Sequence, residues 1–158
     1  MLRVVVLGAA AGGGVPQWNC GCPVCHSARQ HPRLQSTQAS IAVSADDEHW
    51  FLINASPDLR QQLTATPQLH PKRGHLRHSP IAGVILTNSE IDAVAGLLSM
   101  REGSPFTLYA HPRVLTTLKH NSIFNVLGDH VTREPIEIDG TFEPKLRDGS
   151  ASGIEILP

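Results

Sequence analysis

Short apolar runs, bounded by glycine, proline or polar residues, recur along the chain and predict the strands of a largely buried sheet. The predicted strands are Leu2–Leu7, Ala39–Ser44, Trp50–Asn54, Ile81–Leu86, Phe106–Ala110, Glu134–Ile138 and Ile154–Leu157. The first of them is rich in β-branched residues and is expected to be buried. The second alternates in polarity, which places Ile41 and Val43 on one face. The polar residues 46–48 predict a hairpin turn before the third strand.

Segments with helical periodicity or helix-start signals lie between several of these strands. The predicted helices are Cys25–Gln30, Pro57–Leu63, Ile91–Arg101 and Pro112–Leu118, of which the last can continue to Leu127 before Gly128. Ser56 is expected to cap the second helix. The third is expected to turn five apolar residues inwards, namely Ile91, Val94, Ala95, Leu97 and Leu98. The alternation of strands and helices predicts an α/β fold with helices packed on a mixed sheet, in a single domain spanning residues 1–158.

Composition and charge narrow the class of protein. The chain has 158 residues, 41% of them hydrophobic and 17% charged, which is typical of a globular protein with a sizeable core. A net charge of −1 provides no basic field for nucleic acid. No apolar run reaches transmembrane length, so no membrane partner is expected, and the first run is too short for a signal peptide. Three clustered cysteines fit a reducing compartment and predict a cytoplasmic location.

The strongest chemical signal is a cluster that contains every cysteine of the chain, Cys20, Cys22 and Cys25, in the spacing C-x-C-x-x-C. Cysteines this close together are poorly placed to form disulfides with one another. Gly21 and Pro23 permit the tight turns that bring three thiolates onto one tetrahedral zinc ion. The alternative is three reduced thiols without a ligand. Three thiolates leave one zinc ligand to be supplied from elsewhere.

Two further segments have features of binding sites. The glycine-rich turn Gly8–Gly14 follows a strand, as phosphate-binding turns do, but no helix follows it, so we interpret it as a flexible turn leading to the cysteines. After the strand Ile81–Leu86, the residues Asn88, Glu90 and Asp92 can present oxygen ligands. Ser89-x-x-Asp92 also fits a capping box with a purely structural role, and the pattern alone leaves both interpretations open. Histidines 70, 75 and 78 lie in a polar loop and are expected to be solvated.

Taken together, these motifs resemble the metallo-β-lactamase superfamily and, within it, the coenzyme PQQ synthesis protein B family. The resemblance rests on four blocks: Leu7–Gly14, Pro16–Cys25, Asn54–Gln62 and Ser89–Gly103. It implies an αββα sandwich of which this chain covers about the N-terminal half. It also implies a structural Zn²⁺ in the cysteine loop, with a histidine from the other half as the fourth ligand. Because the superfamily packs two αβ halves together, the chain alone is expected to expose apolar surface and to self-associate.

The resemblance also assigns a second metal site. The superfamily's His-x-His-x-Asp-His motif aligns with Asn88, Glu90, Asp92 and Ala93. The PQQ family replaces the first two ligands with acidic or amide residues and keeps the Asp-His pair. Here the histidine position is Ala93, which leaves Asp92 as the main ligand from this half, with Asn88 and Glu90 as uncertain contributors. The site would hold Fe²⁺ if it binds metal.

Function follows from the resemblance as a set of alternatives. One is metal-dependent hydroxylation of the tyrosine moiety of the PQQ precursor, a small molecule derived from glutamate and tyrosine. A second is a non-catalytic, zinc-stapled carrier that takes part in the transport of PQQ or its precursor towards the periplasm. A metallo-hydrolase or phosphodiesterase is the weakest alternative, because Asn88, Glu90 and Ala93 do not provide the ligands of a two-metal site. A homodimer is compatible with all three.

Overall fold

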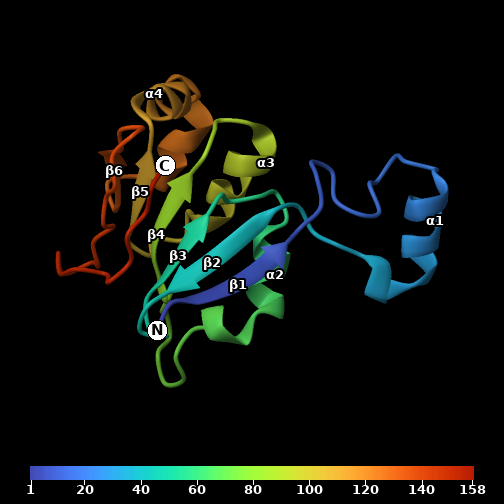
Figure 1. Ribbon diagram of the computed structural model, residues 1–158, viewed down its shortest axis with the longest axis horizontal. Coiled ribbons are helices and arrows are strands. Elements are labelled where there is room, and N and C mark those ends of the chain that lie inside the picture. The colour runs from blue at the N-terminus through green and yellow to red at the C-terminus, as the bar shows by residue number, and fades with distance from the viewer.

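A six-stranded mixed sheet organises the computed structural model, which describes all 158 residues (Figure 1). Its strands lie side by side in chain order: β1 Arg3–Gly8, β2 Ser40–Ser44, β3 Trp50–Ile53, β4 Ile81–Leu86, β5 Phe106–Ala110 and β6 Val131–Pro135. The pairs β1–β2 and β2–β3 are antiparallel, and the remaining pairs are parallel. The predicted mixed sheet is therefore confirmed.

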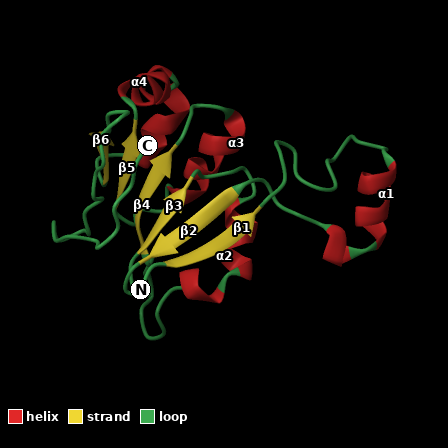
Figure 2. Cartoon of the chain, viewed as in Figure 1, coloured by secondary structure: helices red, strands yellow, loops and turns green.

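Four short α-helices accompany the sheet: α1 Pro23–Gln30, α2 Leu59–Ala65, α3 Ile91–Val94 and α4 Pro112–His120 (Figure 2). Four 3-10 helices add to them, at Pro32–Leu34, Pro67–Leu69, Ala95–Met100 and Ser122–Leu127. The larger core packs α2, α3, α4 and three of the 3-10 helices against one face of the sheet, around Leu52, Val84 and Leu108. A smaller core on the other face includes Phe51 and Tyr109. None of the helices has the length and apolar character that a membrane span requires.

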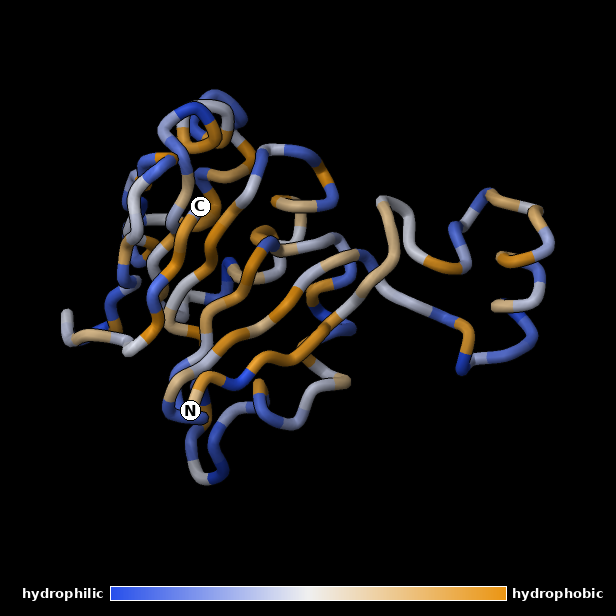
Figure 3. The backbone as a smooth tube through the Cα atoms, in the orientation of Figure 1, coloured by the Kyte–Doolittle hydropathy of each residue, from blue (hydrophilic) through white to orange (hydrophobic).

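The first strand departs from its prediction. It forms an edge of the sheet, and Val4 and Val6 are 53% and 65% exposed, whereas Val5 and Leu7 pack against the larger core. An apolar run on an edge strand is buried only on the face that helices cover, because successive side chains point to opposite faces. The apolar residues along β1 are visible in Figure 3. Self-association through such a surface stays a prediction.

The last two predicted strands are also corrected. Strand β6 spans Val131–Pro135, three residues before the predicted start, because Phe106 of β5 pairs with Val131. The segment Ile154–Leu157 is no strand: a single bridge joins Ile156 to Phe142. The apolar pattern there reflects burial on the smaller core, where Ile154 is 5% exposed, rather than pairing with the sheet.

Two helices differ from their predicted bounds. The segment Ile91–Arg101 forms one α-turn and continues as the 3-10 helix Ala95–Met100. Because a 3-10 helix has three residues per turn, the inward face shifts, and Ile91 is 72% exposed while Val94 and Leu97 are buried as predicted. Helix α2 begins two residues later than predicted. The Ser56 hydroxyl still accepts a hydrogen bond from the N–H of Asp58, within the turn before this helix.

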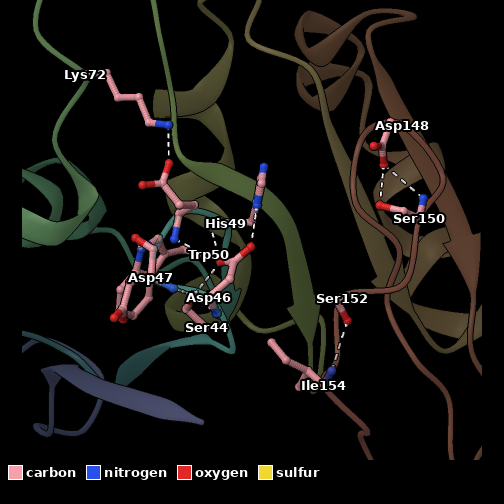
Figure 4. A network of polar contacts seen from close by, with 11 residues as sticks. Ser44, Asp46, Asp47, His49, Trp50, Lys72, Asp148, Ser150, Ser152 and Ile154 are labelled. Carbon is pink, nitrogen blue, oxygen red and sulfur yellow. Dashed lines mark hydrogen bonds and ion pairs between the residues drawn. The ribbon is translucent and has the colours of Figure 1, made fainter. Parts of the chain in front are cut away.

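The hairpin turn between β2 and β3 is built around Asp46 (Figure 4). Its carboxylate accepts hydrogen bonds from the backbone N–H groups of Glu48 (2.9 Å) and His49 (2.8 Å), from the Ser44 hydroxyl (3.2 Å) and from the His49 ring (2.7 Å). Partial burial opposes ionisation, but these four donors together hold the pKa of Asp46 well below its usual range. The charged form of Asp46 therefore stabilises the turn.

We expect Asp46→Ala to lower the free energy of unfolding by about 1 kcal/mol at pH 7, a modest value because both partners of the Asp46–His49 pair are partly solvated. A carboxylate whose pKa is lower in the folded state contributes stability above its unfolded pKa of about 3.9, and loses it as pH falls further. The difference between variant and parent should therefore shrink below about pH 4. Urea unfolding between pH 3 and 7 measures it. Glu155→Ala, which removes an exposed carboxylate from the chain, should show no such trend.

Residues 9–39, here called the arm, leave the sheet after β1 and return to it at β2, carrying α1 away from the sheet (Figure 1). The root of the arm is closed by isolated bridges between Ala10 and Gln38 and between Val15 and Ser36. All three cysteines lie within or just before α1, which forms the far end of the arm in Figure 1. The predicted turn at residues 8–14 does deliver the chain to them, and Gly13 and Gly14 adopt the positive φ angles of 95° and 72° that favour glycine.

Candidate metal centre

The three cysteines converge at the start of α1. Their sulfur atoms all lie within 4.8 Å of one another, and no other set of three or more histidine, cysteine or acidic side chains in the chain does the same. Cys22 is the N-cap of α1, and its Sγ accepts a hydrogen bond from the backbone N–H of Cys25 at 3.5 Å. Pro23 follows at the first helical position, as its fixed φ favours. The start of α1 therefore places Cys22 and Cys25 close together, as the spacing predicted.

The sulfur atoms differ in environment. Cys22 is exposed, and the backbone N–H of Cys25, followed by the Cys20 side chain, lowers the pKa of Cys22 to about 7. Cys25 is buried. The backbone of Gln17 favours its thiolate, but burial and the neighbouring sulfurs of Cys20 and Cys22 outweigh this and raise the pKa of Cys25. A soft set of three sulfur donors fits Zn²⁺, and a divalent cation would offset the repulsion among the thiolates.

No residue of this chain completes the set of four ligands. His26 follows Cys25 directly, but its Nε2 lies 3.2 Å from the Gln30 amide nitrogen. The loop histidines form other contacts: His70 Nε2 lies 2.9 Å from the Thr64 carbonyl, and His78 Nδ1 accepts a hydrogen bond from the N–H of Lys72. A zinc ion held by these three sulfurs would therefore take its fourth ligand from another source or from water.

The second predicted site lies where β4 ends and α3 begins. Asn88, Glu90 and Asp92 are all exposed there, and neither Glu90 nor Asp92 belongs to a cluster of three or more histidine, cysteine or acidic side chains. The Asn88 amide oxygen accepts a hydrogen bond from the N–H of Glu90 at 2.8 Å. The capping-box interpretation is wrong, because Glu90 rather than Ser89 is the N-cap and no side chain caps the helix. The structure thus leaves Asp92 without a capping role.

An unforeseen contact joins Asp92 to the glycine turn at the root of the arm. A methyl carbon on Gly12 would lie 3.3 Å from Oδ2 of Asp92, so the backbone of the turn passes close to this carboxylate. Gln38 holds the turn in place, because its side-chain oxygen accepts a hydrogen bond from the N–H of Gly13 at 3.0 Å and its amide nitrogen donates to Asp58 at 3.1 Å. The sequence did not predict a role for Gln38, because nothing in the hydrophobic pattern or in the motifs marks this residue. Asp58 was included only as part of the motif block Asn54–Gln62.

Backbone hydrogen bonds dock the turn that carries Asp92. The N–H of Ala55 donates to the carbonyl of Ala93 at 2.7 Å, and the N–H of Gly96 donates to the carbonyl of Ala55 at 2.8 Å. Ala93 is 2% exposed and belongs to the larger core. The exposed Asp92 and the buried Ala93 therefore occupy a firmly held turn at the carboxyl end of a central strand, a common place for ligands in α/β folds.

Comparison with known proteins identifies relatives of the whole chain. Residues 49–157 match the model of the β-lactamase superfamily domain. The chain is 72% identical to the coenzyme PQQ synthesis protein B of Rhodopseudomonas palustris over 157 residues, covering 99% of the chain and 51% of that relative. The protein of the same name from Bradyrhizobium diazoefficiens is also 72% identical, with 100% of the chain and 52% of that relative covered. The chain thus spans about half the length of the curated relatives it matches.

Solved structures share the fold. The crystal structure of zinc-bound PqqB from Methylobacterium extorquens superposes with a TM-score of 0.84 at 55% identity, covering 91% of this chain and 52% of that one. A diphosphatase from the PhnP family superposes with a TM-score of 0.68 at 26% identity, covering 87% of this chain and 51% of that one. The metallo-β-lactamase-like architecture predicted from the motifs is thereby confirmed.

Proposed function

Because this chain belongs to the β-lactamase superfamily, as a homologue of coenzyme PQQ synthesis protein B, we propose that it serves the biosynthesis of pyrroloquinoline quinone (PQQ) as a metal-dependent protein that acts on the precursor. The observation that carries this proposal is the 72% identity over nearly the whole chain to relatives of that name. Since those relatives are about twice as long, the activity is proposed for the whole protein to which these residues contribute.

The arm contributes a structural Zn²⁺ site in this proposal. Cys20, Cys22 and Cys25 supply three sulfur ligands, and the compact cluster of sulfur atoms at the start of α1 supports their convergence on one ion. A zinc ion there would tie the loop of residues 17–22 to the helix that follows. The Methylobacterium extorquens relative crystallised as a zinc-bound protein, which supports zinc as the metal.

The reaction proposed for the second site is hydroxylation of the tyrosine moiety of the precursor. Fe²⁺ held by a mixed set of carboxylate and imidazole ligands, with open positions, supplies such chemistry when bound. Asp92 is the residue of this chain that would hold it. Its exposure beside the glycine turn, its lack of a capping role and the docked backbone of its turn support this assignment.

One observation favours a second candidate, a non-catalytic carrier of PQQ or its precursor. Ala93 offers no lone pair where the superfamily motif has histidine, and Glu90 and Asp92 belong to no cluster of three or more histidine, cysteine or acidic side chains. The same observation weighs against a two-metal hydrolase. Metal content separates the remaining two candidates. Iron together with precursor-dependent uptake of dioxygen is expected of the hydroxylase, whereas zinc alone and no uptake of dioxygen would establish the carrier.

We expect Ala93→His to raise Fe²⁺ binding at the second site while leaving zinc at the cysteines unchanged. The substitution adds an imidazole next to Asp92, within the turn that the Ala55 backbone holds. Titration of both proteins with Fe²⁺ under anaerobic conditions measures the change, and thermal unfolding shows whether the buried position accepts the ring. Ala95→His, placed two residues further on, is the matched control. Equal Fe²⁺ affinity in a folded Ala93→His and in the parent would show that position 93 is not a ligand position.

A further inference from the structure

We propose that Arg29 is a positioning residue for the cysteine metal site, holding the loop before α1 in the conformation that presents Cys20 to the ion. The inference rests on the proposed zinc site and adds to it a residue that does not bind the metal. Arg29 lies in the last turn of α1, and its side chain reaches back along the helix to the loop that precedes it.

The Arg29 guanidinium bonds to three backbone carbonyls of this loop. Nη1 donates to the carbonyl of Cys20 at 2.8 Å. Nη2 donates to the carbonyl of Gln17 at 2.8 Å and, at 3.4 Å, to that of Trp18. No other side chain donates to these carbonyls. The planar guanidinium, with its fixed fork of five donors, can satisfy several acceptors at once, which a lysine ammonium on a flexible stem does less well.

These hydrogen bonds join the two parts of the metal site. Cys22 and Cys25 are placed by the first turn of α1, through its N-cap and its helical backbone. Cys20 lies outside the helix, in a turn closed by the hydrogen bond from its own N–H to the Gln17 carbonyl at 3.1 Å. Arg29 ties that turn to α1, so the position of Cys20 relative to the other two sulfurs depends on it. A loop ordered before the metal arrives costs less conformational entropy on binding.

The proposed role of Arg29 depends on its position in α1 and not only on its positive charge. Arg33 carries the same charge in the same arm, is exposed and forms no hydrogen bond or ion pair through its side chain. Neither the arm nor β1 contains an acidic residue that Arg29 could pair with instead. Residues that orient metal ligands typically contribute about 10–100-fold to metal affinity.

The test is Co²⁺ binding, followed by the thiolate-to-cobalt charge-transfer bands in competition with a chelator of known affinity. We expect Arg29→Gln to weaken Co²⁺ binding by about 10–100-fold. Arg33→Gln removes the same charge and should bind as the parent does. Arg29→Lys keeps the positive charge but lacks the planar guanidinium with its several donors. Its Co²⁺ affinity should lie between those of the parent and Arg29→Gln. Near-UV circular dichroism and thermal unfolding of the metal-free proteins serve as the check that the sheet is intact.

Equal losses of Co²⁺ affinity in Arg29→Gln and Arg33→Gln would overturn the proposal, because the loss of one positive charge would then explain both. Unchanged affinity in Arg29→Gln would overturn it as well. Failure of the underlying zinc site looks different: the parent and Cys22→Ser would then give the same cobalt spectrum, without thiolate bands. The experiment therefore distinguishes an incorrect role for Arg29 from the absence of the cysteine metal site.

Discussion

Cys22→Ser is expected to lower the zinc affinity of the arm by about a hundredfold. Structural zinc sites in small peptides bind with about 10–16 kcal/mol at pH 7, so the loss of one of four ligands removes on the order of 3 kcal/mol. A serine hydroxyl stays protonated at this pH and does not replace a thiolate. Serine is also a good N-cap, so the start of α1 keeps its cap in the variant. The effect can therefore be assigned to the metal.

Metal analysis of the purified proteins, followed by titration with a zinc chelator, measures this change. Val24→Ser is the matched control, since it places the same side chain at an exposed position between Cys22 and Cys25. The control should retain one zinc per chain. Thermal unfolding should show a lower stability for Cys22→Ser than for Val24→Ser, because the energy of metal binding is part of the energy of folding. Equal zinc content and affinity in Cys22→Ser and the parent would contradict the assignment of the three cysteines as zinc ligands.

Gly96→Ala is expected to destabilise the protein by about 3 kcal/mol, at the upper end of the usual cost of overpacking. A methyl carbon at this position would lie 2.2 Å from the carbonyl oxygen of Ser56 and 2.8 Å from the carbonyl carbon and oxygen of Ala55. All of these are backbone atoms, so no side chain can rotate away. Relief of the clash requires the turn that carries Asp92 to separate from residues 55–56, which breaks the hydrogen bonds that dock it.

Urea unfolding, followed by circular dichroism, is the measurement for this variant. Gly140→Ala provides the control, because a methyl group there has no atom within 4 Å and the residue does not adopt a positive φ angle. We expect Gly140→Ala to unfold at nearly the same urea concentration as the parent. If Gly96→Ala also unfolded at that concentration, the close docking of α3 and the 3-10 helix after it on residues 55–56 would be incorrect.

Features that depend on neighbours along the chain were predictable from the amino-acid sequence. The bounds of β4 and β5 and the hairpin turn at Asp46 were predicted because burial and turn chemistry leave local patterns. The clustering of the three cysteines was predictable for the same reason, since all three lie within six residues, in a short turn and the first turn of α1. The motif blocks then indicated the superfamily, which the comparisons bear out.

The packing of the elements against one another sets which surfaces are covered and which distant residues come into contact. The pattern of β1 could not reveal that it is an edge strand, because an apolar run records a preference for burial and not the presence of a neighbour. The change from α-helix to 3-10 helix after Val94 follows from docking on residues 55–56. Gly12 meets Asp92 through space, and no local pattern encodes a contact between positions 12 and 92. Arg29 likewise acquires its role only when α1 turns it back onto the loop, because its carbonyl partners carry no side-chain signature.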